Sequence, residues 1–306
     1  MKTSSLYDQG GSSVVEDGHF IALPFVGVMD GVSEPHDRDH PRIRFCDGRL
    51  TGGELVSRIT EGFFIQQSSR QSVLDLDLGD LVLEASKLTG DKFRANGLSL
   101  DKTGELPGAT FAIARVSEEE VEIIQAGDCL ALWVTDDDEI NITSNQVRGH
   151  DDEFNGLIER LQRRIAKEKY RIELEEATPD QSKAIREAMW PEFRLKWGKG
   201  RARDVNNPLS PKGYGLLNGQ TELKKIWFHK TIQRDHLSAI LLFTDGMVPW
   251  ETMKDKNDTE IARAVYAAYK KGGLPELLKV ARGTEERFRA VGWTDAAEVA
   301  AVAVDF

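Results

Sequence analysis

The sequence predicts one large layered domain of mixed α and β structure with an insertion. Three observations lead to this fold class. The chain has 306 residues, a length that a single layered α/β or α+β domain can reach without dividing. Hydrophobic residues make up 40% of the chain, which is enough to fill a sizeable core, and 30% of the residues are charged. Segments with the period of a β-strand alternate along the chain with segments of helical period.

Two short β patterns and two helical patterns make up the first third of the chain. Residues 18–25 and 25–29 are predicted strands, and the second ends at an Asp-Gly turn. A loop rich in proline and charged residues follows at 34–44. Residues 53–67 and 78–97 then repeat apolar side chains at helical spacing, so we expect two helices that pack against a sheet.

The rest of the chain is predicted to be mostly β outside one helical segment. The predicted strands are residues 109–116, 121–125, 130–135, 139–143, 238–244 and 298–306. Short turns join the first three of these strands, which predicts an antiparallel meander. Two amphipathic helices, 259–271 and 274–290, are expected before the final strand.

Residues 151–212 differ in composition from the segments around them. They begin with long charged helices that carry one apolar stripe, and they end in an irregular stretch, 198–211, rich in Gly, Arg, Asn and Pro. We interpret this segment as a helical or flap-like insertion within a single domain that spans residues 1–306.

Charge and composition argue against several classes of protein. The chain carries 51 acidic and 40 basic side chains, a net charge of −11, which disfavours broad attraction to nucleic acid or to an anionic membrane. Its longest apolar stretches, such as 237–247, are too short to cross a bilayer, and residues 1–11 lack the apolar segment of a signal peptide. Two cysteines, Cys46 and Cys129, show no zinc-binding spacing and fit a reducing compartment. We therefore expect a cytoplasmic protein.

Four segments place acidic residues where an apolar β pattern ends or begins. Their acidic residues are Glu16, Asp17, Asp30, Asp245 and Asp295. A glycine directly follows in three of the segments, which lets the backbone turn sharply and brings a peptide carbonyl close to whatever the carboxylate holds. A single Asp-Gly pair is more often a simple turn. In combination, the segments offer the carboxylate, carbonyl and water ligands that Mg²⁺ and Mn²⁺ prefer.

The order of these segments resembles the metal-dependent protein phosphatases of the 2C family. The family's motifs are an early Glu-Asp, an Asp-Gly after a strand, a Gly-Ser/Ala-Thr, a Gly-Asp-Ser, a second Asp-Gly and a final Asp-Asn. Here they are Glu16-Asp17, Asp30-Gly31, Gly108-Ala109-Thr110, Gly127-Asp128-Cys129, Asp245-Gly246 and Asp295-Ala296. The order and spacing hold over essentially the whole chain, so the six motifs together carry more weight than any one of them.

The resemblance implies an α+β fold, an αββα sandwich of two antiparallel sheets flanked by helices, with two Mn²⁺ or Mg²⁺ ions at one end. By position, Asp30 would bridge the two ions, the Gly31 carbonyl would complete one coordination sphere, and Asp245 with Asp295 would hold one ion. The pair Glu16-Asp17 would act largely through metal-bound waters. A water between the ions would attack phosphorus, so the implied activity is hydrolysis of phosphoserine and phosphothreonine in a phosphoprotein, chiefly dependent on Asp30 and Asp245.

Several positions depart from the family's pattern, including Ser33-Glu34 in place of a second pair of glycines. Ser12 stands where the family often has a phosphate-binding arginine, and Val32 stands where some members have a histidine. Asn145 replaces the aspartate associated with a third metal ion, and Ala296 replaces the final asparagine. These changes leave the expected pair of ions in place. They leave the third ion and the recognition of phosphate open.

Three side chains are candidates to bind substrate in place of the missing arginine. Arg201 and Arg203 carry guanidinium groups, which bind phosphate through paired hydrogen bonds, although a solvated basic loop is an equally good interpretation. His36, in the loop after Asp30, could supply a proton. Two other functions stay open because of the altered positions: a catalytically weak or inactive regulatory module, and a phosphatase of a small phosphorylated molecule.

Overall fold

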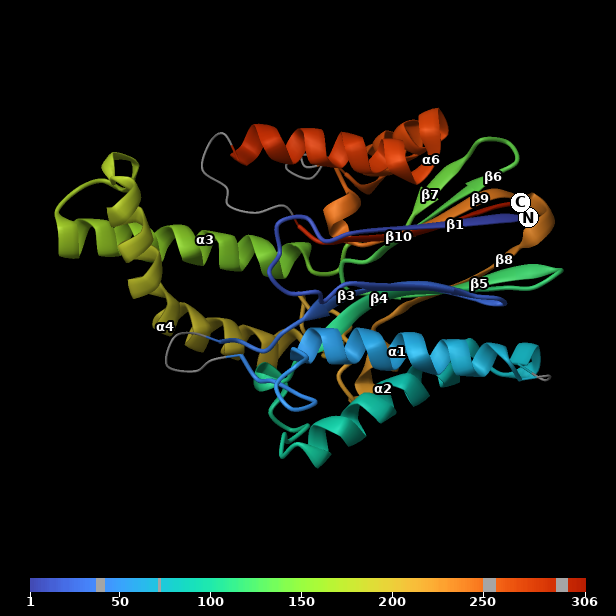
Figure 1. Ribbon diagram of the computed structural model, residues 1–306, viewed down its shortest axis with the longest axis horizontal. Coiled ribbons are helices and arrows are strands. Elements are labelled where there is room, and N and C mark those ends of the chain that lie inside the picture. Colours follow the sequence, from blue (N-terminus) through green and yellow to red (C-terminus); the bar gives the residue numbers. More distant parts are fainter. Residues whose placement is uncertain (37–41, 71–72, 250–256, 290–296) are drawn as a thin grey trace.

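Two five-stranded antiparallel sheets lie face to face in the computed structural model (Figure 1). The structure describes residues 1–36, 42–70, 73–249, 257–289 and 297–306. The first sheet has the order β1 (Lys2–Asp8), β10 (Val299–Asp305), β9 (Leu237–Phe243), β6 (Leu130–Thr135) and β7 (Ile140–Ile142). The second sheet has the order β2 (Gly18–Ala22), β3 (Phe25–Val32), β4 (Gly108–Val116), β5 (Glu120–Ala126) and β8 (Phe228–Gln233).

Helices cover the outer face of each sheet. Helices α1 (Gly52–Ser68) and α2 (Leu78–Ala95) lie on the second sheet, and α6 (Asp258–Arg289) lies on the first (Figure 1). The predicted α+β fold, an αββα sandwich of two antiparallel sheets, is therefore confirmed. Within the described part of the chain, no helix combines the length and the apolar character needed to span a bilayer.

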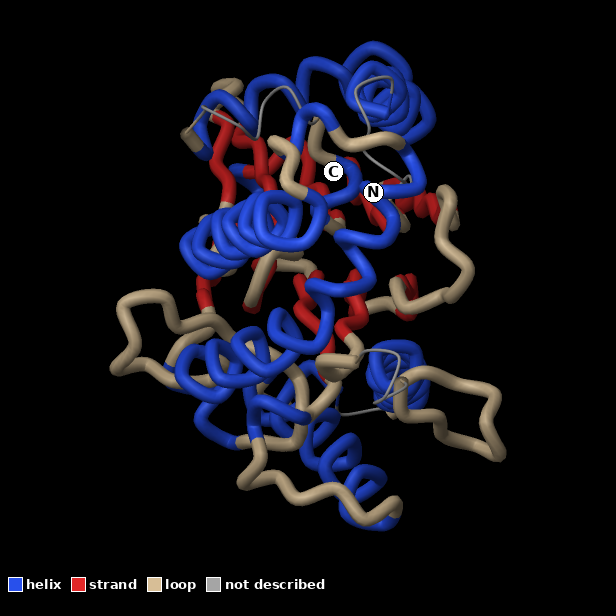
Figure 2. The backbone as a smooth tube through the Cα atoms, turned by 90° about the vertical axis from the view of Figure 1, so that its left-hand side faces the viewer, coloured by secondary structure: helices blue, strands red, loops and turns tan. Residues whose placement is uncertain are grey.

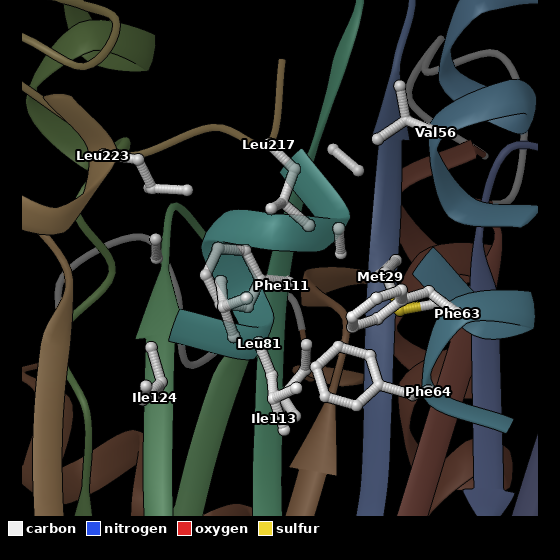
Figure 3. Packing of buried hydrophobic residues seen from close by; sticks show 14 of the residues in the cluster. Met29, Val56, Phe63, Phe64, Leu81, Phe111, Ile113, Ile124, Leu217 and Leu223 are labelled. Atoms are coloured by element: carbon white, nitrogen blue, oxygen red, sulfur yellow. The ribbon is translucent and has the colours of Figure 1, made fainter. Parts of the chain in front are cut away.

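The central strands of the second sheet, β3, β4 and β5, are buried on both faces because they present apolar side chains in both directions. In β3, Met29 packs on the helix side with Phe63 and Phe64 of α1 (Figure 3), whereas Val26 and Val28 point into the space between the sheets. The helices begin where the sequence provides caps: the Thr51 hydroxyl accepts the Glu54 amide of α1, and Asp77 serves α2 in the same way.

Several predicted elements differ from the structure. The expected meander is wrong, because β6 leaves the sheet of β4 and β5 and pairs with β7 and β9 in the other sheet. Strands β1 and β8 were not predicted. Strand β3 continues to Val32, so the expected Asp-Gly turn after Met29 lies inside the strand. The two expected C-terminal helices, by contrast, are confirmed: the backbone of α6 is non-helical at Gly272 and Gly273, which divides the element into two helices at the predicted place.

The segment predicted as an insertion contains two long helices at one end of the sandwich. Helix α3 (Arg148–Ile165) packs against α4 (Pro179–Asp204) through a small apolar cluster of its own (Figures 1 and 2). The cluster contains Phe154, Leu157, Leu161, Met189 and Phe193. Helix α4 runs through much of the stretch predicted to be irregular and ends at Asp204. We call residues 148–204 the helical arm.

Candidate functional site

A cavity of about 500 Å³ gathers most of the acidic residues singled out in the sequence. Glu16, Asp17, Asp30 and Asp245 all line it, together with Gly31. They come from three segments that are far apart in the chain. Asp295, the remaining expected metal ligand, lies outside the described residues, although the neighbouring Ala297 and Glu298 line the same cavity.

The alternation of β3 positions Asp30. Val26, Val28 and Asp30 share one face of the strand, because successive side chains point to opposite faces. The same alternation that fills the space between the sheets thus places a carboxylate at its rim. Asp30 pairs with Thr110 of β4 in the antiparallel register. A Cβ at Gly31 would overlap the Glu16 carbonyl oxygen and the backbone of Gly53, so the approach of these segments requires glycine.

The loop that carries Glu16 and Asp17 is held by hydrogen bonds from distant parts of the chain. The Glu298 carboxylate accepts the backbone amides of both residues, each at 2.7 Å. The Ser57 hydroxyl of α1 donates to the Glu16 carbonyl at 2.7 Å, and the Ser33 hydroxyl donates to the Glu16 carboxylate. Glu298 is a residue of this site that sequence reasoning missed; its only local signal is an acidic side chain at the start of the last β pattern.

Burial and neighbouring carboxylates disfavour the ionisation of the three aspartates that line the cavity. Burial raises the pKa of Asp17 and of Asp30 well above the ordinary value, and neighbouring carboxylates add to both effects. Burial, followed by the charge of Asp128, raises the pKa of Asp245 to about 7. The Asp17 Oδ2 atom is buried without a hydrogen-bond partner among the described residues. A cluster of this kind is stabilised in its ionised form by added positive charge.

The donor set fits hard divalent cations in its chemistry. Carboxylate oxygens, an unpartnered buried Asp17 Oδ2 and the backbone around Gly31 are oxygen ligands of the kind that Mn²⁺ and Mg²⁺ take. Among the described residues, no three Asp, Glu, His or Cys side chains are placed together to hold an ion. Asp295 falls outside that search.

Arg201 and Arg203, two of the three candidates for substrate binding, do not line this cavity as the structure describes it. Arg201 is 1% exposed and donates to the backbone carbonyls of Leu106 at 2.7 Å and Ser33 at 3.4 Å, so it joins the helical arm to the body. Arg203 pairs with Asp204 at 2.6 Å and with Glu153 at 3.0 Å.

The third candidate, His36, lies next to the cavity. Its Nδ1 is 3.0 Å from the Glu34 carbonyl oxygen, and its Nε2 is 3.3 Å from Nη2 of Arg42. Arg42 does line the cavity, and it is a second residue that sequence reasoning missed. It belongs to the charged loop after Asp30, in which the sequence drew attention to a histidine and not to the arginine.

Asn145, at a position that departs from the family's pattern, and the retained residues Thr110, Gly127 and Asp128 have structural roles. The Asn145 side chain accepts the amides of Val147 and Arg148 at 2.8 and 3.0 Å, where α3 begins. The Thr110 hydroxyl donates to Asp128 at 2.5 Å. Gly127, just before Asp128, has a φ of +81°, which favours glycine in the short turn between β5 and β6.

The two-sheet sandwich is the fold of the 2C-type serine/threonine phosphatases. Serine/threonine phosphatase Stp1 from Staphylococcus aureus superposes with a TM-score of 0.54 at 14% identity, covering 100% of this chain and 94% of that one. Serine-threonine phosphatase 2C from Toxoplasma gondii gives 0.55 at 15% identity, with 99% and 94% covered.

A third solved structure is the catalytic domain of the serine/threonine protein phosphatase PstP in complex with two manganese ions. It gives a TM-score of 0.54 at 12% identity, covering 99% of this chain and 96% of that one. No family model matches the sequence, and no curated protein matches it either. The resemblance inferred from the six motifs is therefore confirmed at the level of the fold.

Proposed function

We propose that this chain is a metal-dependent phosphatase that hydrolyses phosphate monoesters on serine or threonine side chains of phosphoproteins. The observation that carries the proposal is the meeting of Asp17, Asp30 and Asp245 in one cavity at the rim of the sandwich. The fold supports it, because the similar solved structures named above are serine/threonine phosphatases. The PstP structure, which holds two manganese ions, supports the choice of Mn²⁺ or Mg²⁺.

In this proposal Asp30, Asp245 and Asp295 hold the pair of ions, with the Gly31 carbonyl as a further ligand. Glu16 and Asp17 face the same cavity and are fixed there by the Glu298 carboxylate and the Ser33 hydroxyl. When bound, the two ions would lower the pKa of a water molecule between them and polarise the phosphoryl oxygens. The protein's own contribution is to keep mutually repelling carboxylates in fixed positions.

A catalytically weak regulatory module is the second candidate. One observation favours it: Ser12, which stands where the family often has a phosphate-binding arginine, lines the cavity. Hydrolysis of a phosphomonoester in the presence of metal distinguishes the two candidates directly.

The test measures hydrolysis of p-nitrophenyl phosphate and of a phosphothreonine peptide at pH 8, with Mn²⁺, with Mg²⁺ and with chelator. We expect turnover that requires metal and a loss of at least about 100-fold in Asp30→Asn, because changes in groups that merely orient a metal ligand already cost about 10- to 100-fold. Asp101→Asn, at an exposed position outside the cavity, is the matched control. Equal turnover in chelator, or full activity in Asp30→Asn, would overturn the proposal.

The choice of substrate is tested with the same preparation. A phosphoprotein phosphatase should show a higher kcat/KM for phosphopeptides than for small phosphorylated metabolites. A clear preference for a small molecule would instead support the third function that the sequence leaves open.

A further inference from the structure

The lining of the cavity presents a problem for a phosphorylated substrate. Five acidic residues line the cavity: Glu16, Asp17, Asp30, Asp245 and Glu298. A phosphate monoester is a dianion near neutral pH and is repelled by such a surface. Two divalent ions would offset much of the acidic charge. A further cation beside the ions would favour binding of the phosphoryl group over binding of a neutral ligand.

Arg42 is the one basic residue that lines the cavity in the described part of the chain. Its Nη1 lies 3.5 Å from Oε2 of Glu16, which is longer than the roughly 2.7–2.9 Å of a well-formed charge-assisted hydrogen bond. Its Nη2 lies 3.3 Å from Nε2 of His36. The side chain is 24% exposed. A guanidinium has five N–H donors, and both contacts that Arg42 makes with described residues are loose, so with respect to these residues they orient the group and leave donors for an anion.

The backbone next to Arg42 is anchored by a buried carboxylate. The Ile43 amide donates to Oε1 of Glu34, a residue that is only 4% exposed. This hydrogen bond joins the two ends of the loop that begins just after β3. Arg42 is therefore presented from a fixed point, which reduces the entropy lost when its guanidinium binds a ligand.

The helical arm supports the same anchor. The fully buried Arg201 of α4 donates to the Ser33 carbonyl, one residue before Glu34, and its positive charge acts on the Glu34 carboxylate. The Ser33 hydroxyl in turn donates to Glu16, which faces Arg42. Arm, loop and cavity are thus connected through hydrogen bonds and buried charge.

We propose that Arg42 binds the phosphoryl group of the substrate, with Glu34 as the residue that positions it. This inference rests on the proposed function, since it assigns a substrate-binding residue to the same site. The guanidinium would donate hydrogen bonds to phosphoryl oxygens from the side of the cavity where it lies beside Glu16. The ligand it selects is the dianionic phosphate monoester, and after hydrolysis the same contact retains inorganic phosphate.

The experiment compares Arg42→Ala and Arg42→Lys with Arg44→Ala, an exposed arginine two residues further along the same loop that does not line the cavity. For a phosphothreonine peptide with saturating Mn²⁺, we expect Arg42→Ala to lower kcat/KM by about 10- to 100-fold, mainly because KM rises. Losing hydrogen bonds between charged partners typically has an effect of this size. Arg42→Lys should recover only part, because an ammonium group cannot form the paired contact. Arg44→Ala should behave as the unaltered protein.

Two binding measurements separate this role from a structural one. The affinity for inorganic phosphate, measured by calorimetry on the Mn²⁺-loaded protein, should fall by a similar factor in Arg42→Ala. The affinity for Mn²⁺, measured by titration without phosphate, should stay within about threefold. Unchanged KM and phosphate affinity would overturn the inference. A fall in Mn²⁺ affinity as large as the fall in kcat/KM would also overturn it, because Arg42 would then act through Glu16.

The phosphate titration also distinguishes failure of this inference from failure of the proposed function. If the unaltered protein shows no hydrolysis with Mn²⁺, the proposed function fails, and the difference in phosphate affinity between the unaltered protein and Arg42→Ala still tests Arg42. If the unaltered protein hydrolyses substrate and Arg42→Ala matches it, only the assignment of Arg42 fails.

Discussion

Replacing Asp245 by asparagine is expected to stabilise the protein without metal and to destabilise it, relative to the unaltered protein, with metal. Asp245 begins the short helix η7 (Asp245–Met247) directly after β9 and lines the cavity. Burial and the nearby charge of Asp128 raise its pKa from 3.8 to about 7. Asparagine keeps the size of the side chain and removes the charge.

The sign follows from proton linkage. Because folding raises this pKa, the unfolded chain loses its proton first as the pH increases, so stability is lost between about pH 4 and pH 7 and the loss is complete above pH 7. A shift of this size corresponds to about 4 kcal/mol. Neighbouring carboxyls can take up a proton in place of Asp245, so we expect about half of that, ~2 kcal/mol, from Asp245→Asn at pH 8. For a chain of this length the melting temperature should rise by about 4 °C.

Manganese should make the unaltered protein more stable than Asp245→Asn. At an ion concentration of 100 times Kd the unaltered protein gains about 2.7 kcal/mol, whereas a variant that lacks an ionised ligand gains little. The assay is thermal unfolding of Asp245→Asn, the unaltered protein and the control Asp101→Asn, in chelator and in Mn²⁺, at pH 8 and at pH 4.5. A variant that is less stable than the unaltered protein in chelator, or that gains as much from Mn²⁺, would refute the reasoning.

Two further predictions concern the surroundings of the cavity. Arg201→Met should lower the free energy of unfolding by about 2–3 kcal/mol, since two buried carbonyls lose their donor. The control Arg94→Met, which breaks an exposed ion pair with Asp91, should cost less than about 1 kcal/mol. Chemical denaturation measures both free energies, and equal costs would contradict the assignment of Arg201 as a buried anchor. Gly31→Ala should abolish metal-dependent stabilisation, because the added Cβ would overlap neighbouring backbone. The control Gly62→Ala, in open space on the exposed face of α1, should be neutral or stabilise the protein by up to about 1 kcal/mol. If the melting temperature of Gly31→Ala depends on manganese as that of the unaltered protein does, the backbone at this position is free to move.

The local pattern of apolar residues was sufficient to predict the helices and strands whose buried face is visible in their own sequence. Strand β4 and helices α1 and α2 were predicted to within a few residues because their apolar period is regular. Strand β8 has an exposed and half-buried pattern along its whole length and therefore gave no apolar signal. The partner of β6 could not be read locally, since β9 lies about a hundred residues further along the chain.

The same distinction separates the parts of the site that were predicted from those that were missed. The Asp-Gly pairs carry their signal in adjacent residues. Glu298 acts on Glu16 across 282 positions, and Arg42 reaches the cavity because Glu34 holds the backbone of Ile43. No property of an isolated glutamate or arginine indicates such a contact. For Arg201 the residue type suggested a role that its surroundings do not support. A guanidinium commonly binds anions, but this one is buried and donates to backbone carbonyls.

The position of the cavity explains why metal binding and stability should be linked in this fold. The alternation of β3 places Asp30 on the face that elsewhere carries Val26 and Val28, so the first carboxylate lies at the edge of an apolar layer where its ionisation is costly. Asp17 and Asp245 approach from the other segments and add to that cost. Without cations the folded chain therefore favours protonated carboxyls, and with cations it favours ionised ones. Because the proposed ions would act on the same groups that weaken the fold, an assay of stability tests the proposed metal site without a substrate.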